Sequence, residues 1–211
     1  MTCEKRDFDG EAASWDKEPG RLKLAAEIAR AIADEVPLSA DMDMLDFGCG
    51  TGLVALELLP SVRSVLGVDG SRGMIEIMNR KIIQKNLTHI ETRYFDLDGG
   101  DVLNGSYDLV ISSMTFHHIR EPRILLEQFY RVIRPSGYLC VADLDPDAGL
   151  FHGDPTGVFH GGFDRAALRR SFNEAGFGQV QDRTASVVKK PLHDGTLGAF
   201  TVFLMTGRKG I

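Results

Sequence analysis

The sequence has few cysteines, no long apolar run and no excess of positive charge. Cys3, Cys49 and Cys140 form no CxxC pair and no zinc-ligand spacing, so we expect free thiols in a reducing, cytoplasmic compartment and no metal site. No stretch approaches the roughly 20 apolar residues of a membrane-spanning helix. Residues 1–20 have no apolar signal core, so we expect neither a membrane span nor export.

The shortage of positive charge also bears on partners. The 211 residues include 24 Lys and Arg against 30 Asp and Glu, which gives a net charge of −6. Nucleic-acid binding favours a basic surface, and binding of single strands also favours interleaved aromatic residues. The sequence has neither feature, so we expect no nucleic-acid partner. The chain length fits one domain with a full core.

Apolar periodicity predicts alternating strands and helices after residue 20. Strands are predicted at 42–47, 62–69, 89–96, 106–114, 138–144, 178–190 and 198–209, and helices at 21–36, 51–59, 71–86, 121–137 and 164–177. This alternation predicts an α/β fold with a doubly wound, mostly parallel sheet. The last two strands are joined by a short turn, so we expect a hairpin that adds an antiparallel strand at or near one edge.

A glycine-rich turn follows the first predicted strand. The stretch "LDFGCGTG" has the pattern D-x-G-x-G-x-G, with Asp46, Gly48, Gly50 and Gly52. Three such glycines let the backbone bend and a ligand lie against it, at the carboxyl edge where doubly wound sheets bind ligands. Asp69, nineteen residues after Gly50, ends the second strand and is placed to accept hydrogen bonds from a ribose.

An acidic residue also ends the third predicted strand. Asp96 and Leu97 could bind the amino group of an adenine and pack against its ring, although aspartate is also common in turns. A nicotinamide-dependent oxidoreductase is an alternative, with the fingerprint G-x-G-x-x-G. Counting from Gly48, the third glycine is replaced by Leu53, and counting from Gly50 it is replaced by Ala55. The second register leaves Asp46 without a role.

At these residues the sequence resembles the class I S-adenosylmethionine-dependent methyltransferases, in particular their type 11 small-molecule branch. The matching segments, in order, are "LDFGCGTG", "GVDGSRGM", "YFDLD", "YDLVISSMTFHHI" and "LLEQFYRVIRPSGYLCVADL". The resemblance implies a Rossmann-like, seven-stranded sheet with an antiparallel last strand. It also implies S-adenosyl-L-methionine as cofactor and a small-molecule methyl acceptor.

The resemblance assigns roles to particular residues. Asp46, Gly48, Gly50 and Gly52 would surround the methionine part of the cofactor. Asp69 would hold the ribose, with Gly70 and Met74 beside the adenosine, and Asp96 and Leu97 would contact the adenine. Ser113 and Met114 would face the methionine end or the methyl group. A subunit that binds the cofactor without turnover is an alternative, because these residues indicate cofactor binding and do not by themselves indicate catalysis.

The expected organisation is a single methyltransferase domain over residues 1–211. Residues 1–37 would form an N-terminal helical lid, 42–144 the cofactor-binding core, and 145–211 a substrate loop and the C-terminal strands. In the lid, Trp15 and Asp16 are candidates for closing the site and excluding water. The alternative is a surface helix that Trp15 pins to the core.

The sequence shows no catalytic triad, and methyl transfer needs none, because a sulfonium methyl is already electrophilic and mainly requires an aligned nucleophile. A base is needed only for an acceptor that carries a proton. His117, next to His118, and His160 are candidates for that base, although an HH pair at this place in similar proteins often shapes the loop instead. The loop "FHGDPTGVFHGGFD" also places His152 and Asp154 toward the substrate. It is interpreted as an ordered substrate loop, a source of a base, or a metal site with no recognised zinc spacing. Cys49 is interpreted as a packing residue rather than a nucleophile.

Overall fold

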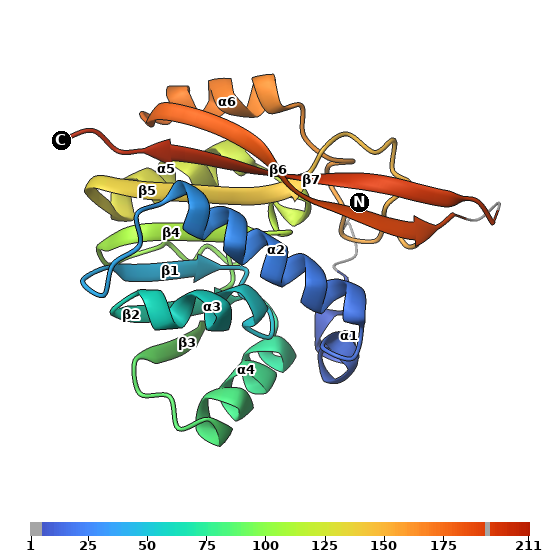
Figure 1. The fold of residues 1–211 in the computed structure, drawn as a ribbon, viewed down its shortest axis with the longest axis horizontal. Coiled ribbons are helices and arrows are strands. Elements are labelled where there is room, and N and C mark those ends of the chain that lie inside the picture. The colour runs from blue at the N-terminus through green and yellow to red at the C-terminus, as the bar shows by residue number, and fades with distance from the viewer. Residues whose placement is uncertain (1–5, 193–194) are drawn as a thin grey trace.

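The computed structural model describes residues 6–192 and 195–211. Cys3, and the first residues of the segment predicted to form a lid, lie outside this range. Within it, the chain forms a three-layer α/β structure in which one sheet lies between two layers of helices (Figure 1). Among the described residues, no helix is both long enough and apolar enough to cross a membrane.

The sheet has seven strands in the order β3-β2-β1-β4-β5-β7-β6. The strands are β1 Asp43–Phe47, β2 Ser64–Asp69, β3 Ile90–Tyr94, β4 Tyr107–Ser113, β5 Ile133–Leu144, β6 Gly178–Pro191 and β7 Leu197–Arg208. The last strand, β7, is antiparallel to both neighbours and lies between β5 and β6. The predicted doubly wound sheet with an antiparallel last strand is therefore confirmed.

Helices cover both faces of the sheet. They are α1 Phe8–Trp15, α2 Pro19–Glu35, α3 Leu53–Leu58, α4 Arg72–Gln84, α5 Pro122–Val132 and α6 Arg165–Glu174, with 3-10 turns η1 Leu59–Ser61 and η2 Phe116–His118. Strand residues alternate between two cores. Met44 packs with α2, α3 and α4 on one face, whereas Leu45 packs with α5 and α6 on the other.

Two element boundaries differ from the sequence predictions. The helix predicted to run to residue 137 ends at Val132, and β5 begins at Ile133. Pro135 cannot continue a helix, and Ser136 has a φ of +67°. The N-terminal helical lid expected over residues 1–37 is divided, since the segment before residue 20 forms a helix of its own, α1. Its N-cap is Asp7, whose side chain accepts a hydrogen bond from the Gly10 backbone N–H at 2.9 Å.

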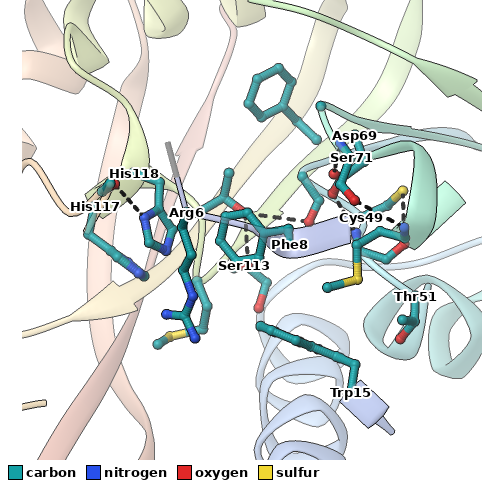
Figure 2. Close-up of a pocket in the computed structure, with 18 of the residues that line it drawn as sticks. Arg6, Phe8, Trp15, Cys49, Thr51, Asp69, Ser71, Ser113, His117 and His118 are labelled. Atoms are coloured by element: carbon teal, nitrogen blue, oxygen red, sulfur yellow. Dashed lines mark hydrogen bonds between the residues drawn. The ribbon is translucent and has the colours of Figure 1, made fainter. Parts of the chain in front are cut away.

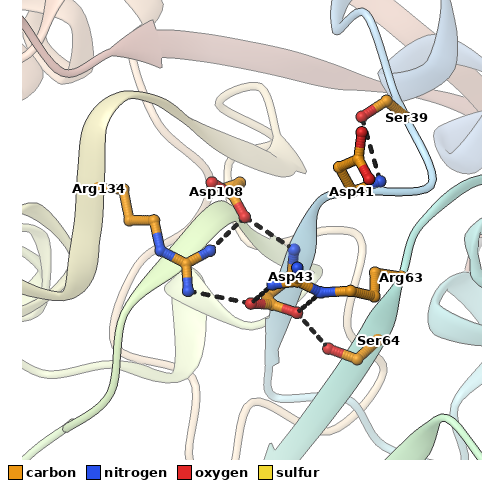
Figure 3. A network of polar contacts seen from close by, with 7 residues as sticks. All are labelled: Ser39, Asp41, Asp43, Arg63, Ser64, Asp108 and Arg134. Atoms are coloured by element: carbon orange, nitrogen blue, oxygen red, sulfur yellow. Dashed lines mark hydrogen bonds and ion pairs between the residues drawn. The ribbon is translucent and has the colours of Figure 1, made fainter.

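The amino end of the sheet is held by ion pairs. Asp43 at the start of β1 binds Arg63, with Nε–Oδ1 at 2.8 Å, and Arg134, with Nη2–Oδ2 at 3.0 Å (Figure 3). Arg134 also pairs with Asp108 of β4, which accepts the Asp43 backbone N–H at 2.8 Å. This network joins β1, β4 and β5 and leaves the carboxyl ends of the strands for a site.

Candidate active site

The glycine-rich turn after β1 has three left-handed residues in alternate positions. Gly48, Gly50 and Gly52 have φ values of +72°, +53° and +82°. A Cβ at Gly48 would lie 2.2 Å from Thr115 Oγ1, and one at Gly52 would lie 2.9 Å from Met78 Cγ. A Cβ at Gly50 would meet nothing within 4 Å. Only Gly50 therefore combines the left-handed backbone with open space.

Asp69 joins this turn to the next strand. Its Oδ2 accepts the Gly50 backbone N–H at 2.8 Å, and its Oδ1 accepts the Ser71 backbone N–H at 2.8 Å. Burial raises the pKa of Asp69, and these two hydrogen bonds oppose that rise. Each carboxylate oxygen has a second lone pair, so Asp69 keeps the capacity to accept ligand hydroxyls.

Asp46 lies beneath the turn at the end of β1 and is almost fully buried. Burial, followed by the charge of Asp69, raises its pKa to about 8. Burial also raises the pKa of the Cys49 thiol well above its usual value. Because a thiol is nucleophilic only as the thiolate, this environment favours the packing role expected for Cys49.

A cavity of about 670 Å³ opens beside these residues. This volume falls within the range of roughly 300–1,000 Å³ typical of small-molecule sites. Fourteen of the residues predicted for the site line it: Trp15, Asp46, Gly48, Gly50, Asp69, Gly70, Met74, Asp96, Leu97, Ser113, Met114, His117, His152 and Asp154. Gly52, Asp16 and His160 lie outside the lining. The structure thus brings together most of the predicted positions.

The cavity has two chemically different ends. Asp69, Ser71 and Cys49 lie at one end, and His117 and His118 lie at the other with Arg6 (Figure 2). Phe8 and Ser113 lie between them in the same view. The first end has the polar and glycine residues expected for a nucleotide, and the second has groups that can exchange protons.

Helix α1 is attached across the first end by its two terminal carboxylates. Asp9 Oδ1 accepts the Ser71 hydroxyl at 2.5 Å and the Gly73 backbone N–H at 2.8 Å. Asp16 accepts the Thr51 hydroxyl at 2.6 Å and pairs with Lys81 at 2.5 Å. Asp16 therefore binds the glycine-rich turn through Thr51 and does not line the cavity itself.

The aromatic residues of α1 face the cavity. Phe8 packs edge-on against Trp15, with ring centroids 5.9 Å apart, and against His118, at 5.1 Å. Arg21 of α2 lies over the Trp15 ring, with Cζ 3.6 Å from the centroid. These contacts position an apolar cover between the two ends of the cavity.

The segments after β3 and β4 complete the lining. Asp96 Oδ1 accepts the Gly99 backbone N–H at 3.0 Å in a tight turn. Met114 has a φ of +53°, a conformation rare for residues with a side chain. Its backbone N–H donates to the Ala142 carbonyl at 2.8 Å. Strained residues cluster at functional sites, and Met114 lies beside Ser113 at the junction of the two ends.

His117 is the most buried of the site histidines, with 1% of its surface exposed. Its Nδ1 lies 2.7 Å from Oδ1 of Asp143, a β5 residue with no exposed surface. A carboxylate only accepts hydrogen bonds, so Nδ1 is the donor of this bond and Nε2 is the ring nitrogen left for another partner. This pairing gives His117 the orientation of a general base.

His118 and His152 pack against His117, with ring centroids at 4.1 and 4.8 Å. Burial lowers the pKa of His118 to about 3 and that of His152 to about 4. Both are therefore neutral at pH 7. Nδ1 of His118 donates to the Gly157 carbonyl at 2.7 Å.

His160 lies behind His117 rather than beside the cavity. Its backbone N–H donates to the His117 carbonyl at 3.3 Å, and its Nε2 donates to the Ile119 carbonyl at 2.9 Å. These bonds order the loop after β5 against η2. No group of three or more His, Cys, Asp or Glu within residues 6–192 and 195–211 could hold a metal ion.

Several residues of the site were missed by sequence reasoning. Arg6 and Lys190 line the cavity from opposite ends of the chain, and Asp143 orients His117 from β5. Asp143 had a detectable signal, because an acid within an apolar strand is expected to have a partner. The sequence contains no comparable signal for Arg6 and Lys190, because a basic residue in a polar segment is usually exposed.

A family model described as a methyltransferase domain matches residues 20–183. The chain belongs to this methyltransferase family. An uncharacterized methyltransferase of Schizosaccharomyces pombe is 30% identical over 155 residues, which are 66% of this chain and 55% of the relative. A malonyl-[acyl-carrier protein] O-methyltransferase of Bacillus cereus is 27% identical over 183 residues, which are 84% of this chain and 64% of the relative.

The solved structures include methyltransferases of the same fold. Phosphoethanolamine N-methyltransferase 2 of Haemonchus contortus, in complex with S-adenosyl-L-methionine, has a TM-score of 0.70 at 14% identity. The alignment covers 98% of this chain and 60% of that one. This methyltransferase chain spans about half the length of the first curated relatives, with matched shares of 43–55%.

Proposed function

We propose that this chain transfers a methyl group from S-adenosylmethionine to a small-molecule acceptor. The observation that carries the proposal is the single cavity, which joins the glycine-rich turn and Asp69 at one end to the His117–Asp143 pair at the other. Family membership supports methyl transfer over the nicotinamide-dependent alternative.

The residues of the first end fit a cationic nucleoside. Asp46 has a carboxyl group at the cavity wall that no hydrogen bond from the described residues satisfies, so a ligand ammonium group would supply the missing donor. Asp69 would hold the ribose hydroxyls, with Gly70 and Met74 alongside. The open space at Gly50 leaves room for the methionine portion.

The remaining residues complete the proposed cofactor site. Asp96 and Leu97 would contact the adenine, and Ser113 and Met114 would face the methionine end. When bound, the sulfonium supplies a methyl carbon that is already open to attack. The work left to the chain is to bind, to align the acceptor and to exclude water.

Helix α1 would exclude water as a lid. Asp9 and Asp16 hold it over the cofactor end, and Phe8 and Trp15 give its cavity side an apolar surface. His117 would remove a proton from an acceptor that carries one, through its Nε2. We assign His160 to ordering the loop, because its side chain points to Ile119.

The relatives do not share one acceptor. The Bacillus cereus protein is named for a malonyl group on a carrier protein and the Haemonchus contortus enzyme for phosphoethanolamine. Likeness to them therefore assigns no acceptor to this chain. The volume of the cavity, about 670 Å³, and the aromatic cover of the histidine end support a small-molecule acceptor.

Calorimetric titration of the purified chain with S-adenosylhomocysteine and with NADH tests the proposal. We expect binding of S-adenosylhomocysteine, its loss in Asp69→Ala, and no heat from NADH. Methyl transfer to any member of a panel of phenols, thiols, amines and carboxylic acids would exclude a subunit without turnover. Binding of NADH alone would refute the methyltransferase proposal.

A further inference from the structure

The histidine end of the cavity contains a lysine that forms no ion pair with a carboxylate in the described part of the chain. Lys190, near the end of β6, is half-buried in the cavity wall. Its Nζ donates to the Phe151 carbonyl and lies 4.5 Å from the centroid of the Phe151 ring. No carboxylate within residues 6–192 and 195–211 forms an ion pair with it. A half-buried ammonium group of this kind favours an anionic ligand.

The other charged groups nearby are already occupied. Arg6 pairs with Glu11 through two hydrogen bonds of 2.7 and 2.9 Å. Asp147 acts on Lys190 electrostatically, but its two oxygens accept the backbone N–H groups of Gly149 and Phe151 at 2.9 and 2.7 Å. Among the described residues at this end, Lys190 is therefore a cation whose charge no carboxylate pairs with.

His152 provides a donor at the same place. Its Nδ1 faces Nη1 of Arg6 at 3.5 Å. Arginine has no acceptor, so Nδ1 is the acceptor and Nε2 carries the proton. Nε2 is buried and has no hydrogen-bond partner among the described residues. An unsatisfied buried donor costs about 1–3 kcal/mol, which a ligand oxygen would recover.

The three groups follow one wall of the cavity. Lys190 contacts Phe151, the Phe151 ring packs against His152 at 5.0 Å, and His152 packs against His117. Phe8, Phe151 and Phe159 provide apolar lining around them. A cation, a neutral donor and the His117 imidazole thus follow one another along one wall, beside an apolar space.

We propose, on the basis of the proposed function, that the methyl acceptor is a small hydroxy acid with an apolar body. Its carboxylate binds Lys190 and the Nε2–H of His152, and its hydroxyl lies against Nε2 of His117. The hydroxyl proton passes to His117, and the oxygen forms a bond to the methyl carbon. The methyl–sulfur bond breaks with its electron pair left on sulfur. The products are a methyl ether, S-adenosylhomocysteine and an imidazolium ion, which releases its proton to solvent.

A matched pair of acceptors tests the charge. The probes are 4-hydroxybenzoate and its uncharged amide, 4-hydroxybenzamide, each assayed for methyl transfer from S-adenosylmethionine. We expect kcat/KM to favour the acid by about tenfold to hundredfold, the ratio that corresponds to one charge-assisted contact. Equal rates, or no binding of the acid to the S-adenosylhomocysteine complex, would overturn the proposal.

Substitutions on β6 assign the preference to one side chain. Lys190→Met is expected to bring the ratio of acid to amide near one, and Lys190→Arg to restore it. Lys189→Met is the control, because it removes the same charge from the adjacent, exposed position of the same strand. A preference that persists in Lys190→Met would contradict the assignment.

The histidines are tested by separate readouts. His152→Phe removes the donor and should raise KM for the acid with little effect on the amide. His117→Gln should lower kcat for both probes while the acid still binds the S-adenosylhomocysteine complex. If S-adenosylhomocysteine itself fails to bind, the proposed function fails and this inference with it. If it binds and neutral acceptors are preferred, only the inference fails.

Discussion

At the scale of single residues, the three glycines after β1 have different functions despite the same left-handed backbone. Gly48 and Gly52 admit neighbouring side chains of the protein, Thr115 and Met78, whereas Gly50 faces open space. The sequence pattern predicted a close approach at all three positions. It could not separate packing against the protein from space for a ligand, because both require the same residue type.

Alanine substitutions should separate these two functions. Gly52→Ala should lower the free energy of unfolding by about 1–3 kcal/mol, because the methyl group meets Met78 and the backbone is strained. Gly50→Ala should cost only the strain, about 1–2 kcal/mol, yet should weaken S-adenosylhomocysteine binding more than Gly52→Ala does. Denaturant unfolding and calorimetry measure the two effects. Full affinity in Gly50→Ala would show that the cofactor lies elsewhere.

Asp46 is a residue at which binding and stability conflict. Its raised pKa, about 8, means that the folded chain retains a proton which the unfolded chain releases near pH 4. The unfolded state then binds fewer protons, so the free energy of unfolding falls as pH rises from about 4 to about 8. An acidic group kept buried at this cost is expected to have a ligand.

The variant Asp46→Asn should therefore be more stable than the native chain at pH 8 and should lose part of the decline between pH 4 and 8. It should also bind S-adenosylhomocysteine more weakly, because a neutral amide attracts an ammonium group less. Thermal unfolding across this pH range measures the first effect and calorimetry the second. Asp41→Asn, at an exposed position just before β1, is the control. Equal stability–pH profiles for both variants would argue against a raised pKa of Asp46 that costs stability.

At the scale of elements, α1 is a helix that is held mainly by polar contacts with other parts of the chain rather than by an apolar face. Only Ala12 of this helix is buried, so apolar periodicity gave no signal for it. The helix is instead held by Asp7 at its N-cap and by Asp9 and Asp16, which bind α4 and the glycine-rich turn. The partners of Asp9 and Asp16 are distant in sequence, which is why the bounds of this helix within the expected N-terminal helical lid could not be read from the sequence.

Loosening α1 at one end should affect the exchange of the cofactor. Asp16→Ala removes the bonds to Thr51 and Lys81, and should increase the dissociation rate of S-adenosylhomocysteine several-fold with a smaller effect on stability. Trp15 is the only tryptophan, so stopped-flow fluorescence reports on this helix directly. Glu57→Ala, which removes an exposed charge from α3, is the control. Unchanged dissociation in Asp16→Ala would count against a lid.

The elements with regular patterns were predicted well. All seven strands and the helices α2 to α6 occur close to their predicted positions, because each has an apolar face or a recognisable cap. The start of β5 was misplaced because the apolar run of α5 continues through Ile133 into the strand. The loop after β5 has no periodicity, so the sequence could not separate His152, which lines the cavity, from His160, which does not.

At the scale of the whole molecule, the sheet has a structural end and a chemical end. The ion pairs of Asp43, Arg63, Arg134 and Asp108 lie at the amino ends of the strands (Figure 3). The cavity lies at the carboxyl ends. This separation predicts that the two ends respond independently to substitution, because distant sites without shared partners have additive effects.

Asp43→Asn tests this independence. The bonds to Arg63, followed by those to Ser64 and Arg134, hold the pKa of Asp43 well below its usual range. The stabilisation is therefore present above pH 4 and is lost as pH falls. We expect Asp43→Asn to reduce the free energy of unfolding by about 1–2 kcal/mol at pH 7, and the difference from the native chain to shrink in acid. Affinity for S-adenosylhomocysteine should stay constant, and a parallel loss of affinity would refute the separation.

The place of β7 between β5 and β6 also has a consequence for the order of assembly during synthesis. The ribosome releases β6 before β7, yet β6 has no partner in the sheet other than β7. Until residues 197–208 emerge, the growing chain presents one unpaired edge at β5 and one orphan strand, both open to pairing with other nascent chains. Translation speed through the codons for residues 197–208 should thus influence the yield of native protein.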